Sequence, residues 1–268
     1  MNKRKNKFFF SSADDLLAAI PQYIRQTDTV MDVGPGLRPM NYFRPKLHIL
    51  VEAFAEYSNI LWHRHSDDKS VMLLQGRAEE LLPIFSDNSV DSVMLLDFIE
   101  HLPKETGSSV IAEAERIARE QIVVFTPLGF MEQHIEDGEK DAWGLSGGHL
   151  QEHLSGWTPD DFGSDWDFYI CEQFHTLDWQ QQPLSTPHAA FYAVRNFEYK
   201  PRSVPRVMSD IRLPLPSEIA LNAAQAELTR TREVLAQTQA ELADARRVLS
   251  HPVVRAQRAV WQRIKFWK

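Results

Sequence analysis

The segment Thr29–Met40, TVMDVGPGLRPM, decides the fold of this chain. An apolar run carries one acid, Asp32, and then breaks abruptly at Gly34 and Gly36, a pattern typical of a buried strand that ends in a glycine turn. Glycines fit such a turn because a backbone without Cβ takes positive φ and lets a ligand touch the main chain. A turn of this kind at the edge of a parallel sheet is where nucleotides bind, although spaced glycines also occur in purely structural turns.

A second acid strengthens the nucleotide interpretation. The apolar run 48–51 ends at Glu52, twenty residues after Asp32. An acid at the tip of the second strand can accept hydrogen bonds from both hydroxyls of a ribose. The spacing therefore predicts a site for a ligand that contains a nucleoside.

Strand and helix patterns alternate along the rest of the first 199 residues. A helix is expected from Ser12, a possible N-cap, and another over 104–119. Only ten residues with two prolines separate Gly36 from the second strand, so we expect a short or distorted turn of helix there. Apolar runs predict strands at 30–33, 48–51, 71–74, 90–96, 122–125, 168–171 and 190–194, with a loop over 178–187. The order favours a doubly wound, mostly parallel, seven-stranded α/β sheet.

A family resemblance rests on segments that follow one another in a fixed order. DVGPG, Glu52, QGRAEELLP, FSDNSVDSVMLLDFIEHL and VVFTPLGF resemble the class I S-adenosylmethionine-dependent methyltransferases, over residues 28–197. The resemblance is strongest to the branch with an acid-x-x-Glu-His-Leu segment after the fourth strand. It implies a Rossmann-like methyltransferase fold, an antiparallel last pair of strands, and S-adenosyl-L-methionine as the cofactor.

The resemblance also implies roles for individual residues. It places Asp32, Gly34 and Gly36 against the methionine half of the cofactor, Glu52 on the ribose, Ala78 beside the adenine and Asp97 beside the methionine moiety.

Two arginines depart from the family pattern. Arg38 stands where the family often has a third glycine, and Arg77 where it often has an acid that receives the adenine amino group. Arginine has donors only, so either Glu79 or the backbone takes that second role.

Two other functions compete with methyl transfer. A dinucleotide-dependent oxidoreductase also has spaced glycines and a ribose acid, but Pro39 replaces its third glycine and would obstruct close packing of helix on strand. A catalytically inactive methyltransferase-like scaffold that tethers partners is the non-enzymatic alternative.

The segment 131–162 is rich in His, Trp and Gly and is expected to cover the methyl acceptor. A histidine titrates near neutrality and suits removal of a hydroxyl proton, so His101, His149 and His153 are the candidate catalytic bases. Each also has a structural interpretation, as a helix cap or in ordering the loop. Trp143 and Trp157 can stack on a sugar or ring acceptor, although a buried core position is the more common role of tryptophan.

One pattern in this cover suggests a metal. The run 149–153 reads H-x-x-E-H, as in inverted zinc peptidases, but neighbouring glycines leave room for little more than one helical turn. We therefore expect no metal there.

Composition limits the compartment and the partners. A single cysteine, Cys171, excludes internal disulfides and favours a reducing compartment, and neither a signal peptide nor a membrane-spanning run is apparent. We expect a cytoplasmic protein. The formal net charge of −8 makes nucleic acid a poor partner.

The C-terminal part differs from the rest. A proline-rich linker is expected over 200–216, after a methyltransferase domain over 1–199. Over 217–250 a leucine recurs every seven residues, with Ala or Thr three residues later, which predicts a coiled coil and a homo-oligomer, against a single amphipathic helix on its own domain.

The last segment, 251–268, has five basic residues, no acid and a face of apolar residues and tryptophans. It is typical of a helix on an anionic membrane surface, with a partner protein as the alternative. This organisation resembles, more loosely, bacterial enzymes of O-antigen and other surface polysaccharide biosynthesis at the inner membrane, which implies a sugar or glycan acceptor.

Overall fold

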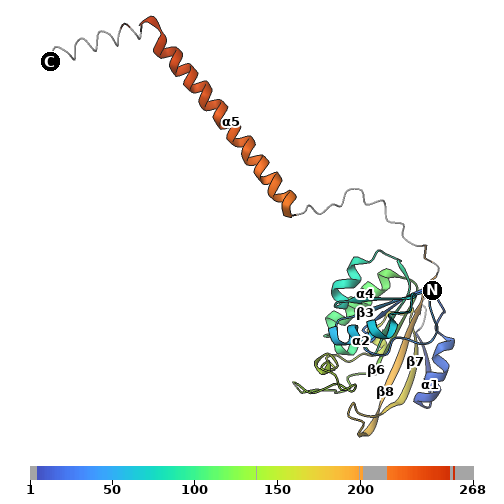
Figure 1. Cartoon of the computed structure of the whole chain (residues 1–268). Coiled ribbons are helices and arrows are strands. Elements are labelled where there is room, and N and C mark those ends of the chain that lie inside the picture. The colour runs from blue at the N-terminus through green and yellow to red at the C-terminus, as the bar shows by residue number, and fades with distance from the viewer. Residues whose placement is uncertain (1–4, 137, 199, 202–215, 254–255, 257–268) are drawn as a thin grey trace. The chain divides into compact units, whose positions relative to one another are not determined.

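The computed structural model describes residues 5–136, 138–198, 200–201, 216–253 and 256. The chain divides into two compact units, residues 1–205 and 206–268. The first unit holds the sheet and is shown with its helices in Figure 1. The second unit contains one long helix among its described residues.

The first unit is a single eight-stranded sheet of order β1-β7-β8-β6-β5-β2-β3-β4. Only β8 runs against its neighbours, β6 and β7, and every other pairing is parallel. The strands are β1 (Asn6–Phe10), β2 (Thr29–Val33), β3 (Leu47–Glu52), β4 (Val71–Gln75), β5 (Val90–Leu96), β6 (Ala118–Pro127), β7 (Asp167–Leu177) and β8 (Pro183–Asn196). The seven predicted strands, including the antiparallel last pair, are confirmed.

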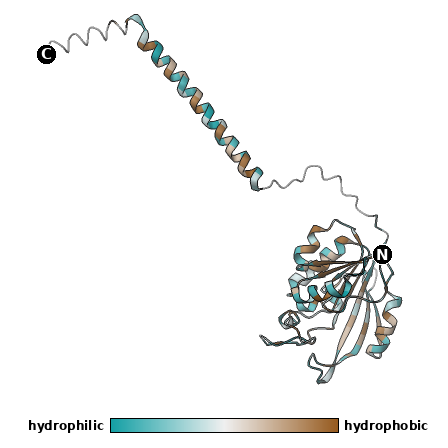
Figure 2. Cartoon of the chain, in the orientation of Figure 1, coloured by the Kyte–Doolittle hydropathy of each residue, from teal (hydrophilic) through white to brown (hydrophobic). Residues whose placement is uncertain are grey.

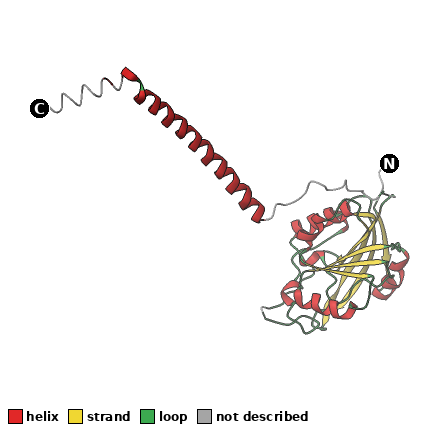
Figure 3. Cartoon of the chain, turned by 45° about the horizontal axis from the view of Figure 1, so that its top comes forward, coloured by secondary structure: helices red, strands yellow, loops and turns green. Residues whose placement is uncertain are grey.

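Helices cover both faces of the sheet, as Figure 3 shows. The α-helices of this unit are α1 (Ala13–Ala19), α2 (Ala55–His65), α3 (Ala78–Leu81) and α4 (Lys104–Ile117). Short 3-10 helices are η1 (Ile20–Gln22), η2 (Leu82–Ile84), η3 (Ile99–His101), η4 (Gly148–Leu150) and η5 (Pro159–Asp161). Ser12 caps α1, because its hydroxyl accepts a hydrogen bond from the Asp15 N–H, as the sequence predicted.

Alternation along the strands divides the core into two layers. Met31 and Val33 of β2 face the layer that contains Val110 and Ile117 of α4. Val30, which precedes Met31, faces the other layer with Leu16 of α1. Because side chains alternate with a period of two, one strand fills both layers, which explains why the central strands are apolar throughout.

An eighth strand, β1, is a correction to the predicted seven. The run NKFFF pairs in parallel with β7, with Phe8 opposite Tyr169. Their rings stack with centroids 5.1 Å apart. A five-residue run at the start of a chain has no periodicity to distinguish it, so only the tertiary partner identifies it as a strand.

Two other sequence predictions were wrong in detail. The crossover between β2 and β3 contains no helical turn among its described residues, and buried Leu37 and Met40 hold it by packing instead. The loop predicted over 178–187 is shorter, because β7 ends at Leu177 and β8 begins at Pro183. The hairpin that these strands form therefore extends well beyond their predicted lengths.

The second unit contains α5 (Pro216–Ser250), whose described residues are all exposed. Apolar residues recur along it, as the colouring of Figure 2 shows. The predicted helix over 217–250 is confirmed, whereas its pairing into a coiled coil stays a prediction. Most of the linker 200–216 and of the tail 251–268 lies outside the described residues.

Candidate active site

The predicted cofactor residues converge on one cleft. A cavity of about 1160 Å³ lies at the carboxyl ends of the central strands, which is where open α/β sheets bind ligands. The glycine turn after β2, the end of β3, the start of α3 and the end of β5 contribute to its wall. Of the predicted site residues, Gly34, Gly36, Glu52, Ala78, Glu79, Asp97, His101, His149 and His153 line it, and Asp32 does not.

The glycine turn needs glycine at both positions. Gly34 and Gly36 have φ values of +65° and +53°, a region that residues with a Cβ rarely adopt. A Cβ on Gly34 would overlap the ring of Phe98, and one on Gly36 would lie 2.6 Å from Cη2 of Trp143. The turn is therefore held by conformation and by close packing together.

Asp32 supports the turn without facing the cleft. Its carboxylate is 1% exposed, accepts a hydrogen bond of 2.7 Å from the Met40 N–H and lies 3.4 Å from Nε2 of His48. It thus fixes the end of the segment that follows the turn. The predicted contact of Asp32 with the methionine half of a cofactor stays a prediction.

Glu52 joins the turn to the end of β3. One carboxylate oxygen accepts from the Gly36 N–H at 3.0 Å and the other from the Phe54 N–H at 2.8 Å. Burial raises the pKa of the Glu52 carboxyl above its ordinary value, against these backbone hydrogen bonds, which lower it. Glu52 is thus fixed in the cleft beside the glycine turn. The interval of twenty residues from Asp32 to Glu52 predicted that it binds a ribose there.

The adenine end of the cleft has one unpredicted pairing. Nε of Arg77 donates to Oε1 of Glu79 at 2.6 Å. Glu79, which the sequence offered as an acceptor for the adenine amino group, is thus paired with the arginine that departs from the family pattern. Ala78 between them is buried and lines the cleft. Whether Glu79 or the backbone takes the role of the missing acid stays a prediction.

Asp97 follows β5 in a strained conformation. Its φ is +55°, and its N–H donates to the carbonyl of Phe125 at 2.9 Å. A non-glycine residue in this region costs free energy, and such positions cluster at functional sites. The bend turns the chain from the strand into η3, which brings His101 to the wall of the cleft and buries Glu100.

Two of the three predicted histidines come together. The ring centroids of His101 and His153 lie 5.0 Å apart, although the two residues are far apart in the sequence. Burial lowers the pKa of His101, and it lowers that of His153 to about 4, with the neighbouring His101 as the second cause. Both rings are therefore neutral at pH 7.

Glu100 is buried beside this pair and was not predicted as a site residue. It is 1% exposed, and neither carboxylate oxygen has a hydrogen-bond partner among the described residues. Burial raises the pKa of the Glu100 carboxyl well above its ordinary value, and the negative charge of Asp97 raises it further. The signal in the sequence was its place in the Asp-x-x-Glu-His segment, but nothing in the sequence showed that it is buried.

The cover is tied to α2 on the far side of the cleft. The Tyr57 hydroxyl donates to Asp141, whose other oxygen accepts from the Trp143 N–H at 2.8 Å. The ring of Trp143 meets that of Tyr57 edge-on at 5.2 Å. His149 lies in the same cover, 5.9 Å from the ring of Phe54, and so apart from the His101 and His153 pair.

Two predictions about the cover are resolved by burial and pairing. Trp157 is 1% exposed and packs in the core, so its common role applies and it is no stacking platform for an acceptor. In the H-x-x-E-H run, Glu152 pairs with exposed His134, while His153 turns toward His101. The run therefore does not assemble as a peptidase-like zinc site.

The β7–β8 hairpin supplies a wall that the sequence did not reveal. Phe174, His175 and Trp179 line the cleft from this hairpin. The sequence analysis placed Trp179 in a loop and assigned Phe174 and His175 to no element, and only the length of the hairpin brings them to the cleft.

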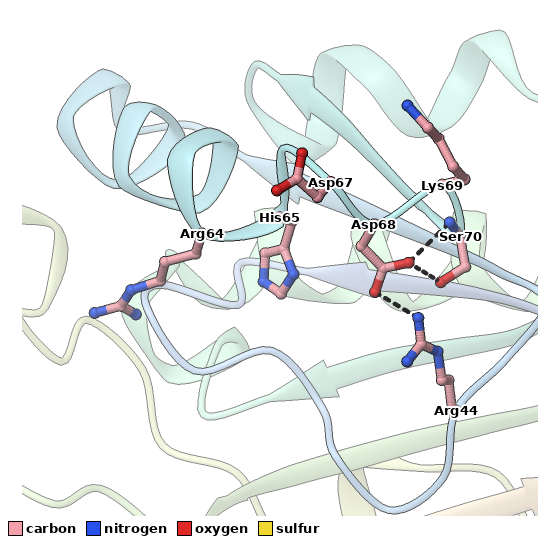
Figure 4. Close-up of a pocket in the computed structure, with 7 residues that line it drawn as sticks. All are labelled: Arg44, Arg64, His65, Asp67, Asp68, Lys69 and Ser70. Carbon is pink, nitrogen blue, oxygen red and sulfur yellow. Dashed lines mark hydrogen bonds and ion pairs between the residues drawn. The ribbon is translucent and has the colours of Figure 1, made fainter.

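A second hollow lies at the opposite edge of the sheet, where α2 ends and β4 begins (Figure 4). Asp68 accepts from Arg44 at 2.9 Å and from the Ser70 hydroxyl at 2.6 Å, so several of its charged groups satisfy one another. It lies at the amino ends of the strands, away from the convergent residues of the main cleft.

Comparison with known families gives a match over the part of the chain that contains the glycine turn. A family model described as "Methyltransferase domain" matches residues 32–125, from Asp32 to the end of the fifth predicted strand. The matched segment contains the glycine turn, Glu52 and the Asp-x-x-Glu-His segment. Over these residues the chain is similar to a methyltransferase domain.

Solved structures give more distant similarities. The YcgJ protein from Bacillus subtilis has 14% identity and a TM-score of 0.46, covering 68% of this chain and 99% of its own. A SAM-dependent methyltransferase from Aquifex aeolicus has 14% identity and a TM-score of 0.37, covering 67% and 89%. One from Archaeoglobus fulgidus has 14% identity and a TM-score of 0.39, covering 68% and 92%. No curated protein sequence matches the chain significantly.

A membrane-spanning helix is absent from the described part of the chain, where no helix combines the necessary length and apolarity.

The packing of the turn predicts a loss of cofactor binding on Gly36→Ala. The added methyl group would meet Trp143 and block close approach to the backbone, so we expect the affinity for S-adenosylhomocysteine, measured by calorimetry, to fall at least about tenfold. Gly129→Ala is the matched control, because φ there is +79° but the space beside it is open. Equal affinities in the two variants would contradict the prediction.

Proposed function

We propose that the chain is an S-adenosylmethionine-dependent methyltransferase that methylates a hydroxyl of a sugar or glycan. The observation that carries this proposal is the convergence of the glycine turn, Glu52 and Asp97 with the His101 and His153 pair in one cleft. The first group suits an adenosyl ligand, and the second stands where an acceptor would approach. The finer statement, oxygen as the methylated atom, is supported by this histidine-rich end and by the aromatic hairpin wall.

The residues present fit the cofactor. Glu52 is fixed beside the turn for the ribose, the turn admits a ligand against its backbone, and Asp97 stands at the opposite wall. The bound cofactor supplies a methyl group on a sulfonium, and the protein must align the acceptor oxygen with it and let its proton leave.

The three histidines remain the candidates for handling that proton. His101 and His153 are neutral and each holds its Nδ1 against a backbone carbonyl, at 3.1 Å from Glu152 O and 2.7 Å from Met131 O. Nε2 of each ring is not used by these two hydrogen bonds. A ring with a pKa of about 4, as for His153, holds a proton weakly, which makes it a weak general base.

Methyl transfer predicts two separable results. S-adenosylhomocysteine should bind in calorimetry, and His101→Ala, His149→Ala and His153→Ala should each keep that affinity while at least one lowers kcat about 100-fold. Turnover would be followed with labelled cofactor and a panel of monosaccharides and oligosaccharides. Absence of binding in the micromolar range would contradict the enzyme and favour the scaffold, and unchanged turnover in all three variants would exclude a histidine base.

Self-association through α5 is the second part of the proposal. Five leucines recur every seven residues, and their side chains are half exposed: Leu221, Leu228, Leu235, Leu242 and Leu249. Such a seam on a helix without neighbours among its described residues is stabilised by pairing with a second copy. With leucine at position a, Glu227 and Glu241 at g would meet Arg232 and Arg246 at e of a parallel partner.

The seam predicts that Leu235→Lys converts a dimer to a monomer in sedimentation velocity, because a charge at position a opposes burial. Ala240→Lys adds the same charge on the opposite side of the helix and should leave the dimer intact. A monomeric wild-type chain, or equal behaviour of the two variants, would contradict the coiled coil.

We also propose that the basic tail, 251–268, attaches the protein to the inner face of an anionic membrane, as its composition suggests. The full chain should sediment with vesicles rich in anionic lipid, and a chain truncated at Val253 should not. Neutral vesicles are the control. Equal sedimentation of both chains would exclude the tail as the membrane anchor.

A further inference from the structure

Three side chains with metal-ligating atoms converge where η3 meets the cover. One ligand atom from each of Glu100, His101 and His153 lies within 4.8 Å of the others. Two backbone hydrogen bonds fix the two segments together, because the Leu154 and Ser155 N–H groups both donate to the carbonyl of Glu100, at 2.7 and 3.1 Å. The convergence is thus built into the backbone of the fold.

The two imidazoles are oriented as metal ligands are. Nδ1 of each ring lies against a backbone carbonyl, that of Glu152 for His101 and that of Met131 for His153. Metal-binding histidines almost always donate one ring N–H to such a group, which fixes the tautomer and leaves the other nitrogen unprotonated.

The carboxylate of Glu100 supplies an independent reason for a cation. It is buried to 99% without a hydrogen-bond partner in the described part of the chain, and Asp97 adds a second negative group beside it. Burying an acid without a partner is costly, and a bound cation removes that cost.

We propose that Glu100, His101 and His153 bind one divalent first-row transition metal ion, which holds the acceptor oxygen in the cleft. Two imidazoles and one carboxylate suit Mn²⁺, Fe²⁺, Co²⁺ or Zn²⁺ better than Mg²⁺, which prefers oxygen ligands. Three protein ligands leave coordination positions open for a substrate. His101 and His153 line the cleft, so an ion between them faces the same space as the glycine turn.

The role of the ion rests on the proposed function. A bound hydroxyl has a lowered pKa, so it becomes a better nucleophile at neutral pH. In the transfer a bond forms between the acceptor oxygen and the methyl carbon, and the carbon–sulfur bond breaks with its electron pair left on sulfur. The hydroxyl proton passes to water. An acceptor with two neighbouring hydroxyls, as sugars have, can occupy two of the open positions.

Direct metal binding tests the site. The full chain, freed of metal with a chelator, would be dialysed against Mn²⁺ or Co²⁺, and the metal bound per chain measured by elemental analysis, with Co²⁺ also followed by its visible absorption. We expect one ion per chain. His153→Ala, His101→Ala and Glu100→Gln should each weaken binding at least about tenfold.

His149→Ala is the matched control, because His149 lies on the same cover and outside the cluster. It should keep metal affinity within about twofold of wild type. A loss as large as that of His153→Ala would overturn the proposal in favour of the H-x-x-E-H run. Binding by wild type no tighter than by His153→Ala would also overturn it.

Calorimetry with S-adenosylhomocysteine separates this failure from failure of the proposed function. Retained binding in His153→Ala shows that the variant is folded, so a difference in metal content then reports the ligand itself. Wild type that binds S-adenosylhomocysteine but no metal overturns the metal site and leaves the methyltransferase standing. Wild type that binds metal but no S-adenosylhomocysteine overturns the proposed function.

Discussion

The cleft depends on one carboxylate that holds two backbone segments together. Glu52 accepts hydrogen bonds from the N–H groups of Gly36 and Phe54, so a single side chain fixes the turn after β2 against the end of β3. Hydrogen bonds from backbone N–H groups to a carboxylate are stronger than neutral ones, and they offset the cost of burying the charge. This link adds to the backbone hydrogen bond of 2.8 Å that the Gly34 N–H donates to the carbonyl of Val51 on β3.

The two ends of the cleft are built by different means. At the nucleoside end the parts lie close in sequence, and the pairing of β2 with β3 sets their spacing. At the other end, Asp97, Glu100 and His101 follow β5, while His153 arrives from the cover. Two backbone hydrogen bonds to the carbonyl of Glu100 join these segments. One end is therefore a property of local topology, and the other of a long-range contact.

This difference explains what the sequence could predict. Apolar runs identified seven strands, and the interval from Asp32 to Glu52 indicated the end of the cleft that Gly36 and Glu52 line, because both signals are local. The strand β1 was missed because only its pairing with β7 distinguishes it from any short aromatic run. Glu100 was missed because burial, and not residue type, makes it unusual. His101 and His153 were both selected for their chemistry, but their pairing could be identified only in three dimensions.

The packing of Trp143 on Gly36 has a consequence for ligand exchange. The indole contacts the turn directly, and the same cover carries His149 and His153. Any movement that frees the turn for exchange of a nucleoside therefore displaces part of the opposite end of the cleft as well. In the proposed methyltransferase, release of the cofactor product and release of the acceptor would therefore both involve the contact of Trp143 with Gly36.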